Sequence, residues 1–194
     1  MFAVPDLAAA ARDLSREHGL ESTEGGRHPG WGTANRIVPL GETYLELIAV
    51  VDEREAAGSA FGRWVLEAGG GFRPLGWAVR TDDLDGVATR LGLTTADGSR
   101  LTAEGTQLRW RYAGAAEAIA RPPLPFFIEW SPGTPFPGRA AEPSPYRLRE
   151  LRLAGDPVVL GGWLGEDELP LRVVDGEPGV QGVLLAGPAG ELVL

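Results

Sequence analysis

The chain has 194 residues, a length that suits one large domain or two small ones with a sizeable core. Its net charge of −9 and pI near 4.8 argue against nucleic acid and anionic membrane surfaces as partners. Cysteine is absent, which excludes disulfides, thiolate nucleophiles and Cys-ligated metals. Because no basic leader or window of about 20 apolar residues occurs, we expect no signal peptide, no membrane helix and a cytoplasmic location.

Residues 1–51 predict a first βαβββ module. Residues 1–4 have the composition of a strand end, and Asp6 is a helix N-cap after Pro5. Apolar residues at helical spacing follow until Gly19, which predicts the end of the helix. Three strands are then expected, over residues 20–29, 33–40 and 44–50.

Residues 52–72 form a bridge with helical character over 52–67, and the same order of elements then repeats over residues 73–131. We expect a strand at 75–80, a helix capped by Asp82-Asp83 and ended by Gly92, and strands at 93–96, 107–112 and 125–130. The repeat is the clearest sign of domain organisation in the sequence.

A third, degenerate copy is predicted for residues 146–194, after a Pro/Gly-rich linker at 131–145. Its elements are a strand at 148–153, a helix at 158–164 and strands at 169–174, 180–186 and 191–194. No carboxylate lies inside its last strand, so we expect a structural role in packing.

Two predicted strands each have a carboxylate inside an otherwise apolar run. Glu46 lies within Tyr44-Leu45-Glu46-Leu47-Ile48, and Glu129 lies within Phe126-Phe127-Ile128-Glu129-Trp130. Because burying an unpaired carboxylate costs several kcal/mol, we expect both residues to have partners. Since they hold matching positions in the two modules, we predict that they face one shared site.

These paired modules resemble the glyoxalase-like domain branch of the vicinal oxygen chelate superfamily. The resemblance rests on Val4-Pro5-Asp6-Leu7, Gly32-Thr33-Ala34-Asn35, the strand around Glu46, Gly76-Trp77-Ala78-Val79-Arg80-Thr81-Asp82-Asp83-Leu84 and the strand around Glu129. It implies an α+β fold in which repeated βαβββ modules form curved, incompletely closed mixed sheets around a cavity.

The resemblance also implies a divalent metal ion bound by the first and last strands of each module. The last-strand positions here are Glu46 and Glu129, and the first-strand position of the second module falls near Gly76-Trp77-Ala78, which offers no ligand. The corresponding His of the first module would precede residue 1. With His28 as a further ligand or general base, the expected cofactor is one divalent metal ion.

Other interpretations of the same residues stay open. Each Glu could pair with a nearby arginine, namely Arg36, Arg109 or Arg111, and two close carboxylates could also serve general acid–base catalysis. Asn35, Trp77, Arg109 and Trp110 are candidates for a substrate pocket, although such tryptophans are more often core.

Two hypotheses about function follow. The first is a metal-dependent lyase, isomerase or dioxygenase in which Glu46, Glu129 and His28 are catalytic. The second is a metal-free protein that binds or sequesters a small molecule. Both expect a small-molecule ligand or substrate, no nucleic acid or membrane partner, and a monomer or homodimer. The sequence names no substrate, because this superfamily hosts many chemistries on one scaffold.

Overall fold

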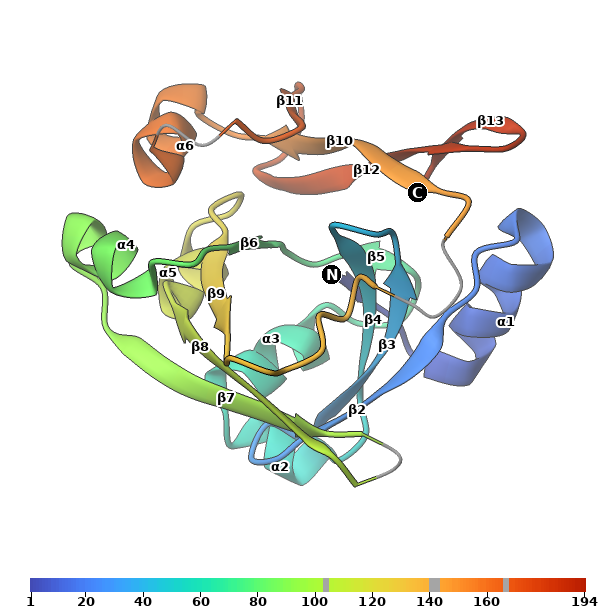
Figure 1. Cartoon of the computed structure of the whole chain (residues 1–194), viewed down its shortest axis with the longest axis horizontal. Helices are drawn as coiled ribbons and strands as arrows, with labels where there is room; N and C mark the ends of the chain where they lie inside the picture. The colour runs from blue at the N-terminus through green and yellow to red at the C-terminus, as the bar shows by residue number, and fades with distance from the viewer. Residues whose placement is uncertain (103–104, 140–143, 166–167) are drawn as a thin grey trace. The chain divides into compact units, whose positions relative to one another are not determined.

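A computed structural model describes residues 1–102, 105–139, 144–165 and 168–194 (Figure 1). The elements of the first predicted module are β1 (Phe2–Ala3), α1 (Leu7–His18), β2 (Thr23–His28), β3 (Thr33–Pro39) and β4 (Tyr44–Val50). The bridge, residues 52–72, contains α2 (Glu53–Ala57) and α3 (Ala60–Glu67), and β5 (Arg73–Pro74) follows directly after it. The predicted order is confirmed, and the bridge holds two separate helices because Ser59 begins α3 as its own N-cap.

The second predicted module contains β6 (Ala78–Arg80), α4 (Leu84–Leu91), β7 (Thr95–Leu101), β8 (Gln107–Ala113), α5 (Ala115–Ala120) and β9 (Phe126–Trp130). Two differences from the sequence prediction matter here. The strand expected at 93–96 lies at Thr95–Leu101, and α5 was not predicted. That helix has only six residues and no side-chain cap, so it lacks the signals that marked the others.

The C-terminal segment contains β10 (Arg147–Ala154), α6 (Pro157–Leu164), β11 (Leu171–Val173), β12 (Gly179–Gly187) and β13 (Gly190–Val193). This is the predicted βαβββ order. The predicted linker 131–145 includes residues 140–143, which lie outside the described residues.

In the described part of the chain, one mixed sheet has the strand order β5-β1-β4-β3-β2-β7-β8-β9-β6, and a second sheet has the order β11-β10-β12-β13. The edge strands β5 and β6 do not pair with each other, so the larger sheet is incompletely closed. The fold class predicted from the sequence is therefore confirmed. No helix in these described ranges is long and apolar enough to span a membrane.

The chain divides into two compact units. Unit 1 comprises Met1–Leu75, Asp97–Trp110 and Trp130–Ser144, and unit 2 comprises Gly76–Ala96, Arg111–Glu129 and Pro145–Leu194. The division into modules 1–51, 73–131 and 146–194 stays a prediction, since these units group the residues in another way.

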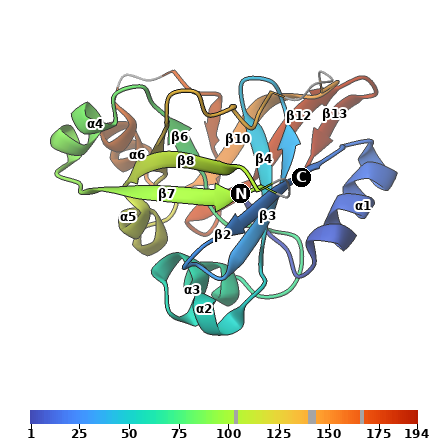
Figure 2. The same ribbon diagram turned by 60° about the horizontal axis from the view of Figure 1, so that its bottom comes forward.

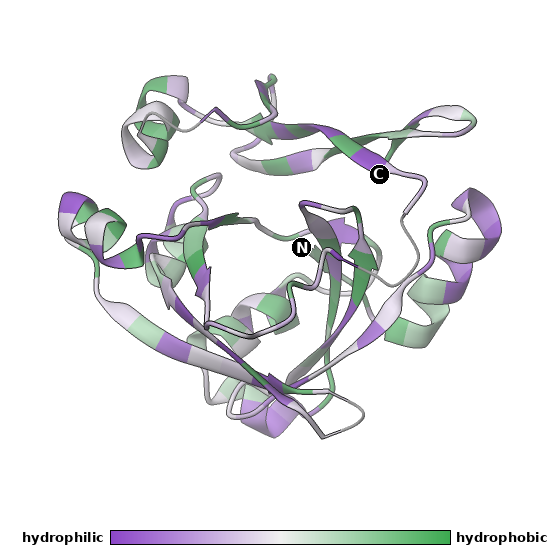
Figure 3. Ribbon diagram, viewed as in Figure 1, coloured by the Kyte–Doolittle hydropathy of each residue, from purple (hydrophilic) through white to green (hydrophobic). Residues whose placement is uncertain are grey.

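In unit 1, helices α1 and α3 pack on β4, the strand that contains Glu46. Helix α1 contacts β3 and β4, and its ribbon has both hydrophilic and hydrophobic residues (Figure 3). Its Leu14 is buried, and Gly19 ends it in the left-handed conformation with φ 65°. Helices α2 and α3 lie side by side, and α3 contacts β4 (Figure 2). These contacts fix the strands that position the site described next.

Candidate functional site

The register of unit 1 places a set of polar side chains on one face of the sheet. Residues directly opposite each other in an antiparallel pair share a face. Ile37 lies opposite Glu46, Gly26 opposite Asn35, and His28 opposite Thr33. Because alternate residues of a strand also share a face, His28, Thr33, Asn35 and Glu46 all point to the same side.

Arg100 joins this face from β7. The pair Arg27–Leu101 links β2 to β7, and both of these residues are exposed. Their neighbours His28 and Arg100 point the other way and are each 5% exposed. Arg100 could not be recognised from the sequence, because its face is fixed only by the register of β7 with β2.

A short chain of hydrogen bonds connects the polar side chains. The Asn35 Nδ2 group donates to Glu46 Oε1 at 2.7 Å, and Arg100 Nη1 donates to Asn35 Oδ1 at 3.2 Å. Asn35 is 4% exposed, whereas Glu46 is half-buried. We call Asn35, Glu46 and Arg100, together with His28 and Thr33, the polar cluster. Asn35 is thus the residue through which a buried guanidinium and a carboxylate are linked.

Burial changes the acid–base behaviour of two members of the polar cluster. It lowers the pKa of the Arg100 guanidinium, against the opposing effect of the nearby Glu46 carboxylate. Burial also lowers the pKa of His28 from 6.5 to about 4; the Glu46 carboxylate opposes this shift, and the smaller effect of Arg100 adds to it. His28 is therefore neutral at pH 7, and its Nδ1 lies 2.9 Å from Thr33 Oγ1.

Aromatic side chains continue from the polar cluster in unit 1. The His28 ring centroid lies 5.5 Å from that of Trp31 and 6.2 Å from that of Trp110. Trp110 in turn lies 5.3 Å from Trp130, and Trp31 lies 4.7 Å from Phe61. Within the described residues, the buried Trp130 Nε1 donates to no acceptor. Polar groups and aromatic surface thus adjoin in one unit.

Two glycines allow the backbone to lie directly against side chains of this arrangement. A Cβ atom added at Gly25 would overlap the Asn35 amide oxygen, and it would lie 2.5 Å from Arg100 Nη1. One added at Gly98 would overlap the Trp110 indole. Glycine is required at both positions because no side chain fits there.

Glu129 belongs to unit 2, where its partners differ. It accepts a hydrogen bond from Arg111 Nη1 at 3.2 Å and one from the Leu84 backbone N–H, at the start of α4, at 3.4 Å. Arg111 also forms an ion pair with Asp85, and this hydrogen bond lowers the pKa of Asp85. Of the alternatives from the sequence, the structure therefore shows the pairing of Glu129 with arginine. A site shared by Glu46 and Glu129 stays a prediction.

The remaining predicted pocket residues have separate environments. Trp77 is buried in unit 2, where its indole N–H donates to the Pro123 carbonyl at 2.7 Å. Arg109 is exposed in unit 1 and donates to Gln107. Asn35 and Trp110 are the two predicted pocket residues that lie in or beside the polar cluster.

The polar cluster does not fit a divalent metal ion. The cluster contains one carboxylate, Glu46, and one imidazole, His28, which is fewer than the three protein ligands typical of a catalytic metal site. Arg100 also places a fixed positive charge near Glu46, which would repel a cation. Across the described ranges, no group of three or more His, Asp or Glu side chains is placed to hold a metal.

Comparison with known proteins identifies a family. A family model described as "Glyoxalase-like domain" matches residues 1–159. None of the curated proteins matches the sequence.

Several solved structures are similar. A hypothetical protein from Staphylococcus aureus is 16% identical over 89% of this chain and 76% of that chain, with a TM-score of 0.59. Methylmalonyl-CoA epimerase from Mycobacterium tuberculosis is 23% identical over 68% and 85% of the respective chains, with a TM-score of 0.47. A variant epimerase of Streptomyces coelicolor bound to 2-nitronate-propionyl-CoA is 20% identical over 70% and 94%, also at 0.47. The likeness to the Staphylococcus aureus protein supports the fold and leaves the chemistry open.

Proposed function

Because the chain belongs to the glyoxalase-like domain family, we propose that it binds a small organic molecule at the polar cluster without a metal ion. This is the second of the two hypotheses from the sequence. The observation that supports it is the buried Arg100, which is hydrogen-bonded to Asn35 and lies near Glu46. A cation of the protein itself thus provides the positive charge that a metal would otherwise supply.

Electrostatics favours this arrangement over a metal-loaded one. Two like charges about 4 Å apart repel by about 4 kcal/mol at an effective dielectric constant of 20. A divalent ion at Glu46 would be repelled in the same way by Arg100, which is linked to Glu46 through Asn35. Arg100 therefore weighs against the predicted metal function of Glu46 and His28.

The state of His28 favours binding over proton transfer. A general base works best with a pKa near the operating pH, and burial lowers the pKa of His28 to about 4. The imidazole is then a weak base at pH 7 that can still form hydrogen bonds. We infer that His28 orients a ligand rather than removing a proton from it.

The surroundings of the polar cluster indicate the ligand. Trp31 and Trp110 offer aromatic surface beside His28, and Trp130 has a buried N–H without an acceptor among the described residues. A planar, largely apolar molecule with a carbonyl or phenol oxygen would match these groups, because aromatic rings stack and an unpaired donor favours an acceptor.

The test is a ligand screen with aromatic carbonyl and phenolic compounds, followed by tryptophan fluorescence in the presence of a chelator. For a phenolic ligand, whose O–H can donate to the Glu46 carboxylate, we expect saturable binding that Glu46→Gln weakens about tenfold or more, since hydrogen bonds to charged groups contribute about 1.5–3 kcal/mol. Arg109→Gln, in the same unit but exposed, is the matched control and should bind as the wild type does. Binding that appears only after a divalent metal is added would refute the proposal.

A further inference from the structure

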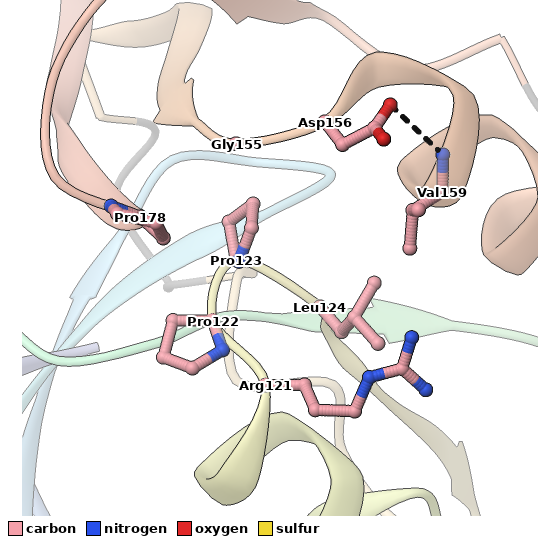
Figure 4. A pocket seen from close by; sticks show the side chains of 8 residues that line it. All are labelled: Arg121, Pro122, Pro123, Leu124, Gly155, Asp156, Val159 and Pro178. Atoms are coloured by element: carbon pink, nitrogen blue, oxygen red, sulfur yellow. Dashed lines mark hydrogen bonds between the residues drawn. The ribbon is translucent and has the colours of Figure 1, made fainter.

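A small hollow of about 120 Å³ lies within unit 2 (Figure 4). Three segments form it: the turn between α5 and β9, the start of α6, and the loop before β12. The lining residues are Arg121, Pro122, Pro123, Leu124, Gly155, Asp156, Val159 and Pro178. None of them belongs to the polar cluster, so the hollow is independent of the function proposed above.

The walls of the hollow are aliphatic. Three prolines, Leu124 and Val159 supply this surface, and Leu124 is 4% exposed. At Gly155 a Cβ atom would lie 2.5 Å from the Pro123 ring, so the backbone of the α6 entry packs directly on that ring. These side chains have no polar atoms, and they favour a branched or cyclic aliphatic group.

The Asp156 carboxylate uses one of its two oxygens to cap α6. As the N-cap of α6 it accepts hydrogen bonds from the Val158 and Val159 backbone N–H groups, at 2.8 and 3.4 Å, and both go to Oδ1. Figure 4 shows the longer of these bonds. No hydrogen bond to Oδ2 occurs among the described residues. The helix cap therefore leaves the second oxygen able to accept from a ligand.

Arg121 provides the opposite charge. Its guanidinium makes no hydrogen bond or ion pair within the described ranges, whereas Arg90 and Arg111 of the same unit bind carbonyl and carboxylate oxygens. Figure 4 shows its side chain extending along the lining beneath Leu124. The hollow thus combines a cation, an anion and an aliphatic surface.

We propose that this hollow binds a small zwitterion with an aliphatic side chain, such as a free amino acid of the size of valine or proline. The ligand carboxylate pairs with Arg121, the ammonium group pairs with Oδ2 of Asp156, and the side chain packs on the prolines. The volume supports a ligand of this size. At about 30 Å³ per water it equals roughly four waters, well below the roughly 300–1,000 Å³ of sites for drug-sized molecules.

The test is calorimetric titration of the full chain with L-valine, 3-methylbutanoate and 2-methylpropylamine, the last two each lacking one charge. We expect valine to bind at least about tenfold more tightly than either, because a charge-assisted hydrogen bond contributes about 1.5–3 kcal/mol. If valine shows no saturable binding at concentrations up to about 10 mM, the proposal is overturned. Equal binding of valine and 3-methylbutanoate would overturn the assignment of Asp156.

Two variants test the contributions of Asp156 and Arg121 to valine binding one at a time. Asp156→Asn keeps a good N-cap, so α6 should stay folded. The variant should bind valine about tenfold more weakly and 3-methylbutanoate as tightly as the wild type does. Arg121→Gln should weaken the binding of valine and of 3-methylbutanoate by a similar factor, since both ligands carry a carboxylate. Arg149→Gln changes an exposed arginine of unit 2 outside the hollow and is the matched control. Valine binding that is unaffected by the first two variants would contradict the inference.

Discussion

Glu46 and Glu129 hold matching positions in two predicted modules, yet the structure surrounds them differently. Glu46 accepts from the neutral amide of Asn35, and the cation near it, Arg100, is 5% exposed. Glu129 pairs directly with Arg111, whose side chain is 36% exposed and also binds Asp85. A repeated fold thus preserves the position of a carboxylate without preserving what neutralises it.

This difference in burial indicates which of the two carboxylates can interact strongly with a ligand. Interactions between exposed charges are screened by water and salt, whereas buried charges interact more strongly because the local dielectric constant is lower. The Arg111 pairs are closer to the first kind, since Arg111, Glu129 and Asp85 are 36%, 26% and 72% exposed. They hold β8 against the start of α4. The cation of the polar cluster, Arg100, is buried, so a ligand group placed beside it would interact strongly with it.

Removing the buried cation should have the largest effect. Arg100→Met leaves Asn35 and Glu46 without their cation, and breaking a buried charged network costs about 3–5 kcal/mol. Urea unfolding measures the loss. In the double variant Arg100→Met/Glu46→Gln the cost should be less than the sum of the two single costs, because the charges are removed together. Additive costs would show that Arg100 does not act on Glu46.

Acidification should destabilise the protein through His28. The pKa of His28 is about 4 in the folded chain and 6.5 in the unfolded one, so the unfolded chain binds the proton more readily between these values. Stability is therefore unaffected by this group above pH 6.5 and falls as the pH drops toward 4, by at most about 3–4 kcal/mol at about 1.36 kcal/mol per pKa unit. His28→Gln should lose this part of the pH dependence in denaturation curves taken between pH 7.5 and 4. Parallel pH profiles for both proteins would contradict the assignment.

Filling the space beside Asn35 should have a moderate effect. Gly25→Ala forces a methyl group into the Asn35–Arg100 contact, and overpacking of this kind costs about 1–3 kcal/mol. Thermal unfolding followed by circular dichroism measures it. Gly70→Ala is the matched control, since a Cβ there meets no atom within 4 Å. Equal melting temperatures for the two variants would mean that the polar cluster tolerates displacement.

Breaking the exposed pair should have the smallest effect. Arg111→Met removes the partner of Glu129 and Asp85, and surface pairs contribute little. We expect a smaller drop in melting temperature than for Arg100→Met, and a drop that shrinks further in 1 M salt. A loss as large as that of Arg100→Met would remove the contrast between the two carboxylates.

Much of the fold was predictable because the sequence marks its own boundaries. The caps Asp6 and Asp83 begin α1 and α4, and glycines with positive φ end both helices. The apolar run of β4 also gave its bounds correctly. Helix α5 was missed because it has neither kind of signal.

The site was less predictable, because it depends on pairing between distant segments. Asn35 and Glu46 stood out as polar residues in apolar strands, but their hydrogen bond follows only from the register of β3 with β4. Arg100 lies in a strand that the sequence placed elsewhere, and the pair Arg27–Leu101 orients it. Local patterns find the carboxylate, whereas only tertiary structure identifies the cation near it.

Elemental analysis tests the absence of a metal ion most directly. The purified full chain would be measured before and after chelation, with thermal stability followed as Mn²⁺, Zn²⁺, Fe²⁺ or Ni²⁺ is added. The charge of Arg100 beside Glu46 predicts no bound divalent ion in a fixed ratio and no change in melting temperature on chelation or addition. About one ion per chain, removed together with stability by chelation and absent from Glu46→Gln, would contradict the metal-free site.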